Sequence, residues 1–266
     1  MTAKKRPTLL VVAHGSRSRG WTQAVNTLVE QMVEALSVDS PYGTVRAAFL
    51  EHAAPSIPDA LDAICSQGRG EVDALPLFLT RSGHLETDVP AAIDQRARLL
   101  PPLPPPEWLA DNLMRRLTRF EGALPQTSGV ALVAYGSSTH GHLWDAMLDD
   151  TCQRLQAHGV ARASFAYVGH VAQLSPDPTR RALLKLAATG GAIERLCVLP
   201  VLFGVGMLQQ GPIEQAVVHA RQQIGMPVAY GADAILPDPE LARALLDHAM
   251  TLTLHGPRPH SRNHAT

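Results

Sequence analysis

Side chains able to bind a metal ion follow each of three apolar segments in the first hundred residues of this chain. They are His14 after residues 9–13, Glu51 and His52 after residues 45–50, and His84 shortly after residues 72–79. Imidazole nitrogens and a carboxylate oxygen form a ligand set suited to Fe(II), Co(II), Ni(II) or Zn(II). A neutral histidine binds such an ion reversibly and can take up a proton as the ion leaves. The alternative interpretation is that a histidine at a strand end is a hydrogen-bonded structural residue, and His52 fits that description.

The order of the segments predicts how these side chains are positioned. Apolar runs alternate with stretches in which apolar residues recur every three or four positions, which is typical of alternating strands and helices. The expected strands are residues 9–13, 45–50 and 72–79, and the expected helices are residues 21–36, 57–64 and 90–99. This pattern favours an α/β fold with a parallel sheet. Ligands collect beyond the carboxyl ends of such strands, where the polar side chains lie.

The second half of the chain repeats the first. Residues 130–137 (VALVAYGS) align with residues 9–16 (LLVVAHGS), residues 164–170 with 46–52, and residues 198–203 with 74–79. We therefore predict two homologous lobes, each a parallel sheet flanked by helices. The expected divisions are a first lobe over 1–100, a proline-rich linker with a connecting helix over 101–128, a degenerate second lobe over 129–254, and a disordered tail over 255–266.

The repeat provides an internal comparison, because residues that determine structure should persist in both lobes whereas site residues need persist in only one. Gly15 and Ser16 recur as Gly136 and Ser137, which indicates turn and packing roles. The candidate ligands do not recur: the aligned pairs are His14 with Tyr135, Glu51 with Gly169, and, without gaps, His84 with Leu208 and Glu86 with Gln210. The metal site is therefore expected in the first lobe alone.

Three motifs resemble those of the class II tetrapyrrole chelatases, the sirohydrochlorin cobaltochelatase and ferrochelatase family. They are residues 12–17 (VAHGSR), 49–55 (FLEHAAP) and 76–90 (PLFLTRSGHLETDVP). The resemblance covers nearly the whole chain and implies a bilobal chelatase-like fold. It also implies insertion of cobalt or iron into sirohydrochlorin or a related anionic tetrapyrrole, with His14 and His84 as metal ligands and proton acceptors. Glu51 would assist as a further ligand or proton relay.

An anionic tetrapyrrole would need local binding groups, because 23 basic and 24 acidic residues leave a formal net charge of -1. Arg17 and Arg81 could bind its carboxylates, and Ser16 and Ser137 could add hydrogen bonds. Alternatively, the arginines are solvated and both serines are helix N-caps. Glu86 is either a further carboxylate of the site or a residue that compensates a helix dipole. We expect no cofactor beyond the divalent metal substrate, which is cobalt, iron or nickel.

The remaining features narrow the function further. The charge balance predicts no nucleic-acid partner, and no apolar stretch approaches the length of a membrane span. The three cysteines lack a C-x-x-C spacing, which predicts small core residues in a reducing, cytoplasmic compartment. The glycine-rich residues 204–211 (GVGMLQQG) lack the third glycine of a dinucleotide-binding loop. We expect a monomer whose lobes form an internal pseudo-dimer. The alternatives are a non-catalytic metal or tetrapyrrole carrier, or a chelatase for another tetrapyrrole.

Overall fold

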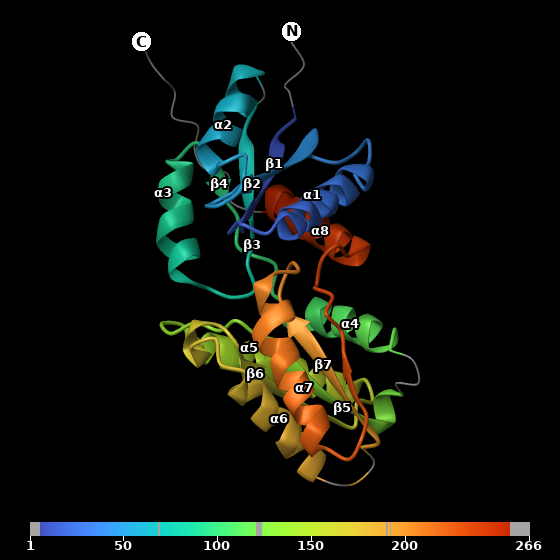
Figure 1. The fold of residues 1–266 in the computed structure, drawn as a ribbon. Helices are drawn as coiled ribbons and strands as arrows, with labels where there is room; N and C mark the ends of the chain where they lie inside the picture. Colours follow the sequence, from blue (N-terminus) through green and yellow to red (C-terminus); the bar gives the residue numbers. More distant parts are fainter. Residues whose placement is uncertain (1–5, 69, 121–123, 190, 192, 256–266) are drawn as a thin grey trace.

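A computed structural model describes residues 6–68, 70–120, 124–189, 191 and 193–255. Within these residues the strands form two four-stranded parallel sheets. Figure 1 shows one sheet in each lobe. The predicted bilobal α/β fold is confirmed. Residues 256–266 of the predicted tail lie outside the described residues.

The first lobe is built around a central strand that is buried on both faces. Its strands are β1 (Thr8–Ala13), β2 (Thr44–Phe49), β3 (Val72–Leu77) and β4 (Arg98–Leu99), in the order β2-β1-β3-β4. All six residues of β1 are buried, as expected for a strand covered on both faces. Ala13 pairs with both Phe49 and Leu77, so the three strands end at one level. The groups that follow them therefore share one edge of the sheet.

Helices cover both faces of this sheet. They are α1 (Arg19–Glu34), α2 (Ile57–Ser66) and α3 (Val89–Ile93), with a π-helical turn η1 (His84–Asp88) leading into α3. Leu9 and Val11 face the core that contains α1, whereas Leu10 and Val12 face the core that contains α2 and α3. The alternation follows from the two-residue repeat of a strand.

The second lobe repeats this order. Its elements are η2 (Pro125–Thr127), β5 (Ser128–Ala134), α5 (Gly141–Ala157), β6 (Arg162–Tyr167), η3 (His170–Ala172), α6 (Asp177–Ala188), β7 (Arg195–Val201), η4 (Gln209–Ile213), α7 (Glu214–Gln223) and β8 (Val228–Tyr230), with the sheet order β6-β5-β7-β8. Ala134 pairs with Tyr167 and Val201, which are the positions that the sequence alignment matches to Phe49 and Leu77. The register thus agrees with the predicted repeat.

The last helix of each repeat packs on the opposite lobe. Helix α4 (Pro106–Leu117) lies against α5 in the second lobe, and α8 (Pro239–His255) lies beside α1 in the first (Figure 1). Apolar residues of both helices and of the inner faces of both sheets form one continuous core. The predicted boundaries at 1–100, 101–128 and 129–254, taken as limits of separate domains, stay a prediction.

A buried polar cluster joins α8 to the first lobe. The Tyr42 hydroxyl donates to Asp73 Oδ2 at 2.8 Å, and Thr253 of α8 donates to the same oxygen at 2.8 Å. Arg98 binds both carboxylate oxygens of Asp73, at 2.8 and 2.6 Å. Burial alone would raise the pKa of Asp73, but the hydrogen bonds from Arg98, Tyr42 and Thr253 outweigh it and hold that pKa below its usual value.

Two expectations from the sequence are wrong in detail. The helix predicted over residues 90–99 ends at Ile93, because Asp94 and Gln95 adopt left-handed backbone with φ of 47° and 60°. Cys65 is exposed and is not a core residue. The other two cysteines are buried, and burial raises the pKa of Cys152 to about 12 and of Cys197 to about 11.

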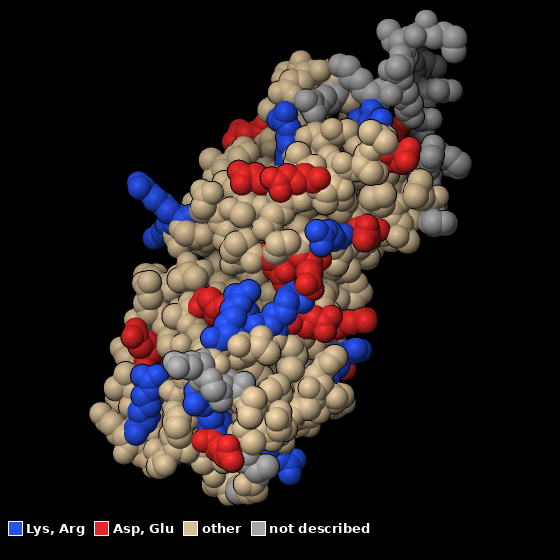
Figure 2. Space-filling model, turned by 90° about the vertical axis from the view of Figure 1, so that its right-hand side faces the viewer, with Lys and Arg blue, Asp and Glu red and all other residues tan. Residues whose placement is uncertain are grey.

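No helix among the described residues is long and apolar enough to cross a membrane. On the face in Figure 2, basic and acidic side chains are interspersed, with neighbouring blue and red groups near the middle of the molecule. That face offers no broad region of one sign, in keeping with the near-zero formal charge.

Candidate metal-handling site between the lobes

The loops that follow the strands of the two lobes contact one another. Ser18, after β1, donates its hydroxyl to the carbonyl of Val205, after β7, at 2.9 Å. A Cβ added to Gly204 would lie 2.4 Å from Cδ1 of Trp21 in α1, so glycine permits a close approach here. The glycine-rich segment 204–211, which lacks the third glycine of a dinucleotide-binding loop, therefore contributes to the packing of the lobes.

His14 and His84 lie next to each other at this edge of the first sheet. Their ring centroids are 4.6 Å apart, and the rings meet edge to face at 77°. The His14 side chain is 36% exposed and that of His84 is 46% exposed, so both rings can be reached from solvent. Imidazole nitrogens bind divalent metals at about 2 Å, so ligands to one ion must be near neighbours. The spacing of these two rings is compatible with a shared ion.

One nitrogen of each ring has a partner that orients it. His84 Nδ1 lies 2.7 Å from Asp88 Oδ2, one helical turn further along η1. His14 Nδ1 lies 3.0 Å from the carbonyl oxygen of Gly15. A ring that donates through Nδ1 presents Nε2 as the metal-binding atom, an arrangement common among metal-ligating histidines.

Glu51 lies against the other nitrogen of His14. Its Oε1 atom is 3.1 Å from His14 Nε2 and 3.4 Å from His52 Nε2. Both nitrogens of His14 thus face oxygen atoms, and a metal ion bound at Nε2 would lie beside the Glu51 carboxylate. This position is compatible with the predicted assisting role of Glu51, which stays a prediction.

The predicted set of three ligands is not assembled as a ready-made metal site. Among the residues that the structure describes, no group of three or more His, Cys, Asp or Glu side chains is arranged to hold a metal ion. His14 and His84 are adjacent, whereas Glu51 occupies the Nε2 side of His14. The assignment of all three residues as ligands stays a prediction.

Local backbone geometry explains why glycine follows His14. Gly15 has a φ of 98°, and a Cβ at this position would lie 1.7 Å from the carbonyl oxygen of Glu51. The Glu51 amide donates to the His14 carbonyl at 2.9 Å, which joins the two strand ends. Gly136 also has a positive φ, of 79°, in the second lobe. The recurring glycine is therefore a turn requirement, as the repeat indicates.

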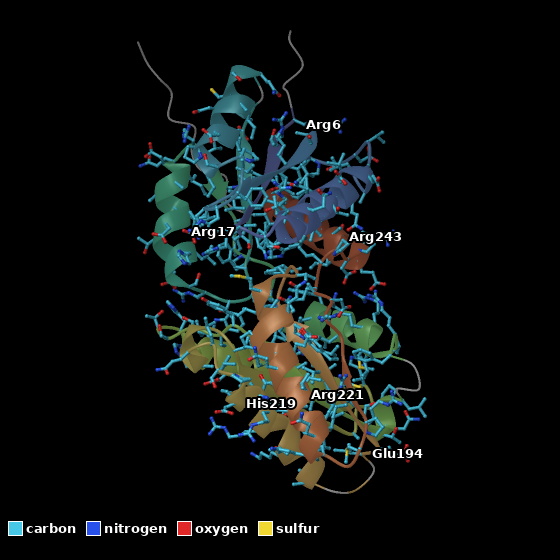
Figure 3. All side chains as sticks on the ribbon, viewed as in Figure 1. Arg6, Arg17, Glu194, His219, Arg221 and Arg243 are labelled. Carbon is cyan, nitrogen blue, oxygen red and sulfur yellow. The ribbon has the colours of Figure 1, made fainter. Side chains whose placement is uncertain are left out.

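Three of the four predicted substrate-binding residues, Ser16, Ser137 and Arg81, have partners within the protein. Ser16 Oγ accepts from the Ser18 amide and Ser137 Oγ accepts from the His140 amide, both at 3.1 Å, so each serine closes a turn before a helix. Arg81 binds Glu86 at 2.6 Å and is 70% exposed. Arg17 is exposed and lies near the end of β1 in Figure 3. Binding of a carboxylate by these four residues stays a prediction.

The second lobe lacks the histidine pair. Tyr135 takes the position of His14, and Gly169 packs so closely that a Cβ there would lie 2.5 Å from the Tyr135 carbonyl oxygen. The second π-helical turn begins at Gln209, one residue after the predicted counterpart Leu208. Gln209 is buried and its side chain bonds to Gly204 and Gly206. This turn is thus stabilised from within.

Two residues beside the site, Asp88 and His140, were not predicted from the sequence. Asp88 binds His84 from four residues further along, a spacing that brings side chains together on a helix and could have indicated the pair. His140 of the second lobe lies 3.4 Å from Glu86, a contact between distant segments for which the sequence contains no signal.

A cavity of about 240 Å³ lies elsewhere, between α4 and the start of α8. Several arginines line it, but Asp238 and Glu240 pair with Arg115, and Asp233 pairs with Arg116. Because these charges are largely matched, we interpret the cavity as part of the contact between α4 and the second lobe.

A model of the CbiX family matches residues 8–119. Sirohydrochlorin ferrochelatase of Priestia megaterium is 27% identical over 227 residues, which cover 81% of each chain. Sirohydrochlorin cobaltochelatase of Methanothermobacter thermautotrophicus is 28% identical over 82 residues, which cover 31% of this chain and 54% of that protein.

Solved structures extend the likeness to both lobes. SirB from Bacillus subtilis with Fe3+ has a TM-score of 0.75 at 19% identity, covering 92% of this chain and 95% of its own. The structure of CbiX described as the terminal enzyme for siroheme biosynthesis in denitrifying bacteria has a TM-score of 0.58 at 16% identity, covering 91% and 97%. At these identities the likeness concerns the fold. The chain is therefore similar to class II chelatases of the CbiX family in its motifs, in the family model that matches residues 8–119 and in its curated relatives.

Proposed function

We propose that this chain inserts a divalent metal ion, cobalt or iron, into sirohydrochlorin or a related anionic tetrapyrrole. The observation that carries the proposal is the contact of the His14 and His84 rings at 4.6 Å beside the second lobe. The relatives named as sirohydrochlorin ferrochelatase and cobaltochelatase support the reaction class and leave the metal open. The metal is a substrate, and we propose no resident cofactor.

The residues support both delivery of the metal ion and uptake of the released protons. Insertion releases two pyrrole protons as the dication loses its water ligands and enters the macrocycle. In our proposal, His14 and His84 present the ion on exchangeable Nε2 ligands, and Asp88 keeps the His84 ring oriented. As the ion leaves, His14 can take up a proton, because its two nitrogens face the oxygens of Gly15 and Glu51. Arg17 and Arg81 are the proposed contacts for substrate carboxylates.

An absorbance assay of sirohydrochlorin with Co²⁺, Fe²⁺ and Ni²⁺ in turn tests substrate and metal together. We expect His14→Ala and His84→Ala each to abolish metallation while the fold is retained, since strand-end loops tolerate truncation better than cores do. Tyr135→Ala, at the matched position of the second lobe, should cost less activity. Wild-type rates in both histidine variants would remove the assigned site.

The same assay separates an enzyme from a carrier. Many equivalents of metallated product per protein indicate catalysis, whereas one equivalent retained on the protein indicates a carrier. Two lobes within one chain support action as a monomer. The monomeric state and the cytoplasmic location both stay predictions.

A further inference from the structure

A charged bridge connects the two lobes beside the histidine pair. Glu86, in the π-helical turn η1 of the first lobe, binds Arg81 through Oε1 at 2.6 Å. Its other oxygen, Oε2, lies 3.4 Å from Nε2 of His140, which precedes α5 in the second lobe. One carboxylate thus links a strand-end loop of each lobe.

The second lobe holds the His140 ring in a defined orientation. The His140 amide donates to Ser137 Oγ at 3.1 Å, and Nδ1 of the ring lies 3.0 Å from the Thr139 hydroxyl. The side chain is only 19% exposed, compared with 36% for Glu86. With Nδ1 engaged by Thr139, Nε2 is the atom that can donate to Glu86.

Glu86 lies within the segment that fixes the proposed metal ligand. The turn η1 begins at His84 and ends at Asp88, and these two side chains bind each other at 2.7 Å. A π-helical turn is rare and frequently lies at a functional site. A contact at its middle residue therefore restrains both the ligand and the carboxylate that orients it.

We propose that His140 is a positioning residue, which holds His84 against His14 by bracing η1 from the opposite lobe through Glu86. In this arrangement the second lobe, which has tyrosine at the position of His14, still contributes to the metal site of the first. The consequence for catalysis rests on the proposed function, whereas the bracing of η1 does not.

Two amide substitutions test whether a donor at the position of His140 Nε2 is required, or only a side chain of similar size. His140→Gln places an amide donor near the position of Nε2, whereas His140→Asn places it near that of Nδ1. We expect His140→Asn and His140→Ala to speed amide hydrogen exchange of residues 84–88 by roughly two- to fivefold, the range of an exposed ion pair. His140→Gln should stay near wild type. His142→Ala, at an exposed histidine in the first turn of α5, is the matched control.

The exchange measurement needs neither metal nor tetrapyrrole, so it tests the bridge alone. In the Co²⁺ insertion assay we expect His140→Asn to raise KM for Co²⁺ more than it lowers kcat, and His140→Gln to restore both. His140→Ala should add nothing further in a Glu86→Ala background, since the bridge is already broken there.

The outcomes distinguish the two proposals. Unchanged exchange of residues 84–88 in His140→Ala and His140→Asn overturns the bridge, as does equal failure of His140→Asn and His140→Gln. If the exchange differences appear but the wild-type protein forms no metallated product, the bridge stands and the proposed function is wrong.

Discussion

At the scale of single residues, the partner of each ring decides which nitrogen is available for a metal. Asp88 binds His84 Nδ1 at 2.7 Å, which leaves Nε2 for the metal ion that we propose. Substitution of such an orienting carboxylate typically lowers metal affinity or activity by about 10- to 100-fold. We therefore expect Asp88→Ala to weaken Co²⁺ binding, measured by calorimetric titration, by at least about tenfold.

Thr87→Ala provides the control for Asp88→Ala, because Thr87 is an exposed neighbour in the same turn. Its affinity for Co²⁺ should match that of the wild type. An affinity unchanged in Asp88→Ala would show that the His84 ring is oriented by other contacts.

At the scale of elements, a polar cluster attaches the last helix to the first sheet. Asp73 accepts hydrogen bonds from Tyr42, Arg98 and Thr253 and is almost fully buried. Removing one partner of a buried ion pair leaves the other uncompensated, so Asp73→Asn should lower the free energy of unfolding by about 3 kcal/mol. Urea unfolding at neutral pH measures this loss, and Asp62→Asn, in an exposed pair with Arg96, is the control.

The same cluster predicts that the free energy of unfolding depends on pH. Because the pKa of Asp73 is lower in the folded protein than in the unfolded chain, the folded state binds fewer protons near that pKa. The ionised Asp73 carboxylate stabilises the fold at pH values above its unfolded-chain pKa of about 3.9. This contribution is lost as the pH falls through the pKa of Asp73 in the folded protein. The stability gap between wild type and Asp73→Asn should narrow below about pH 4. A gap that stays constant to lower pH would contradict this assignment.

The strands and their register could be predicted from the sequence, because local runs of apolar residues determine them. The aligned apolar runs fix the strands and their register, so Ala13 and Ala134 occupy matching positions, and the polar residues after them must share one edge. The sequence does not show that α4 and α8 each pack on the opposite lobe, because an amphipathic helix carries the same pattern whichever lobe it covers. The offset of the second π-helical turn and the contact of His140 with Glu86 likewise depend on how the lobes pack.

At the scale of the whole molecule, the approach of the lobes depends on Gly204. A side chain there would meet Trp21 of α1 at 2.4 Å, and the contact includes the Trp21 backbone at 2.8 Å. We expect Gly204→Ala to shift the loop away from α1 and to lower metallation by about tenfold, the kind of loss that a small misplacement can produce. Steady-state absorbance kinetics measure this effect.

Gly206→Ala is the matched control, since a Cβ at that position meets no atom within 4 Å. Activity should be close to wild type in this variant. If Gly204→Ala is equally active, the lobe spacing does not govern the reaction.

The packing of α8 on the first lobe also has a consequence for folding during translation. The sheet of the first lobe leaves the ribosome early, but the helix that covers its inner face beside α1 is the last helix of the structure. At a translation rate of about 5–20 residues per second, the nascent first lobe waits roughly 10–30 s for α8. During that interval an apolar surface is uncovered, so we expect the growing chain to depend on chaperones until its final helix has been synthesised.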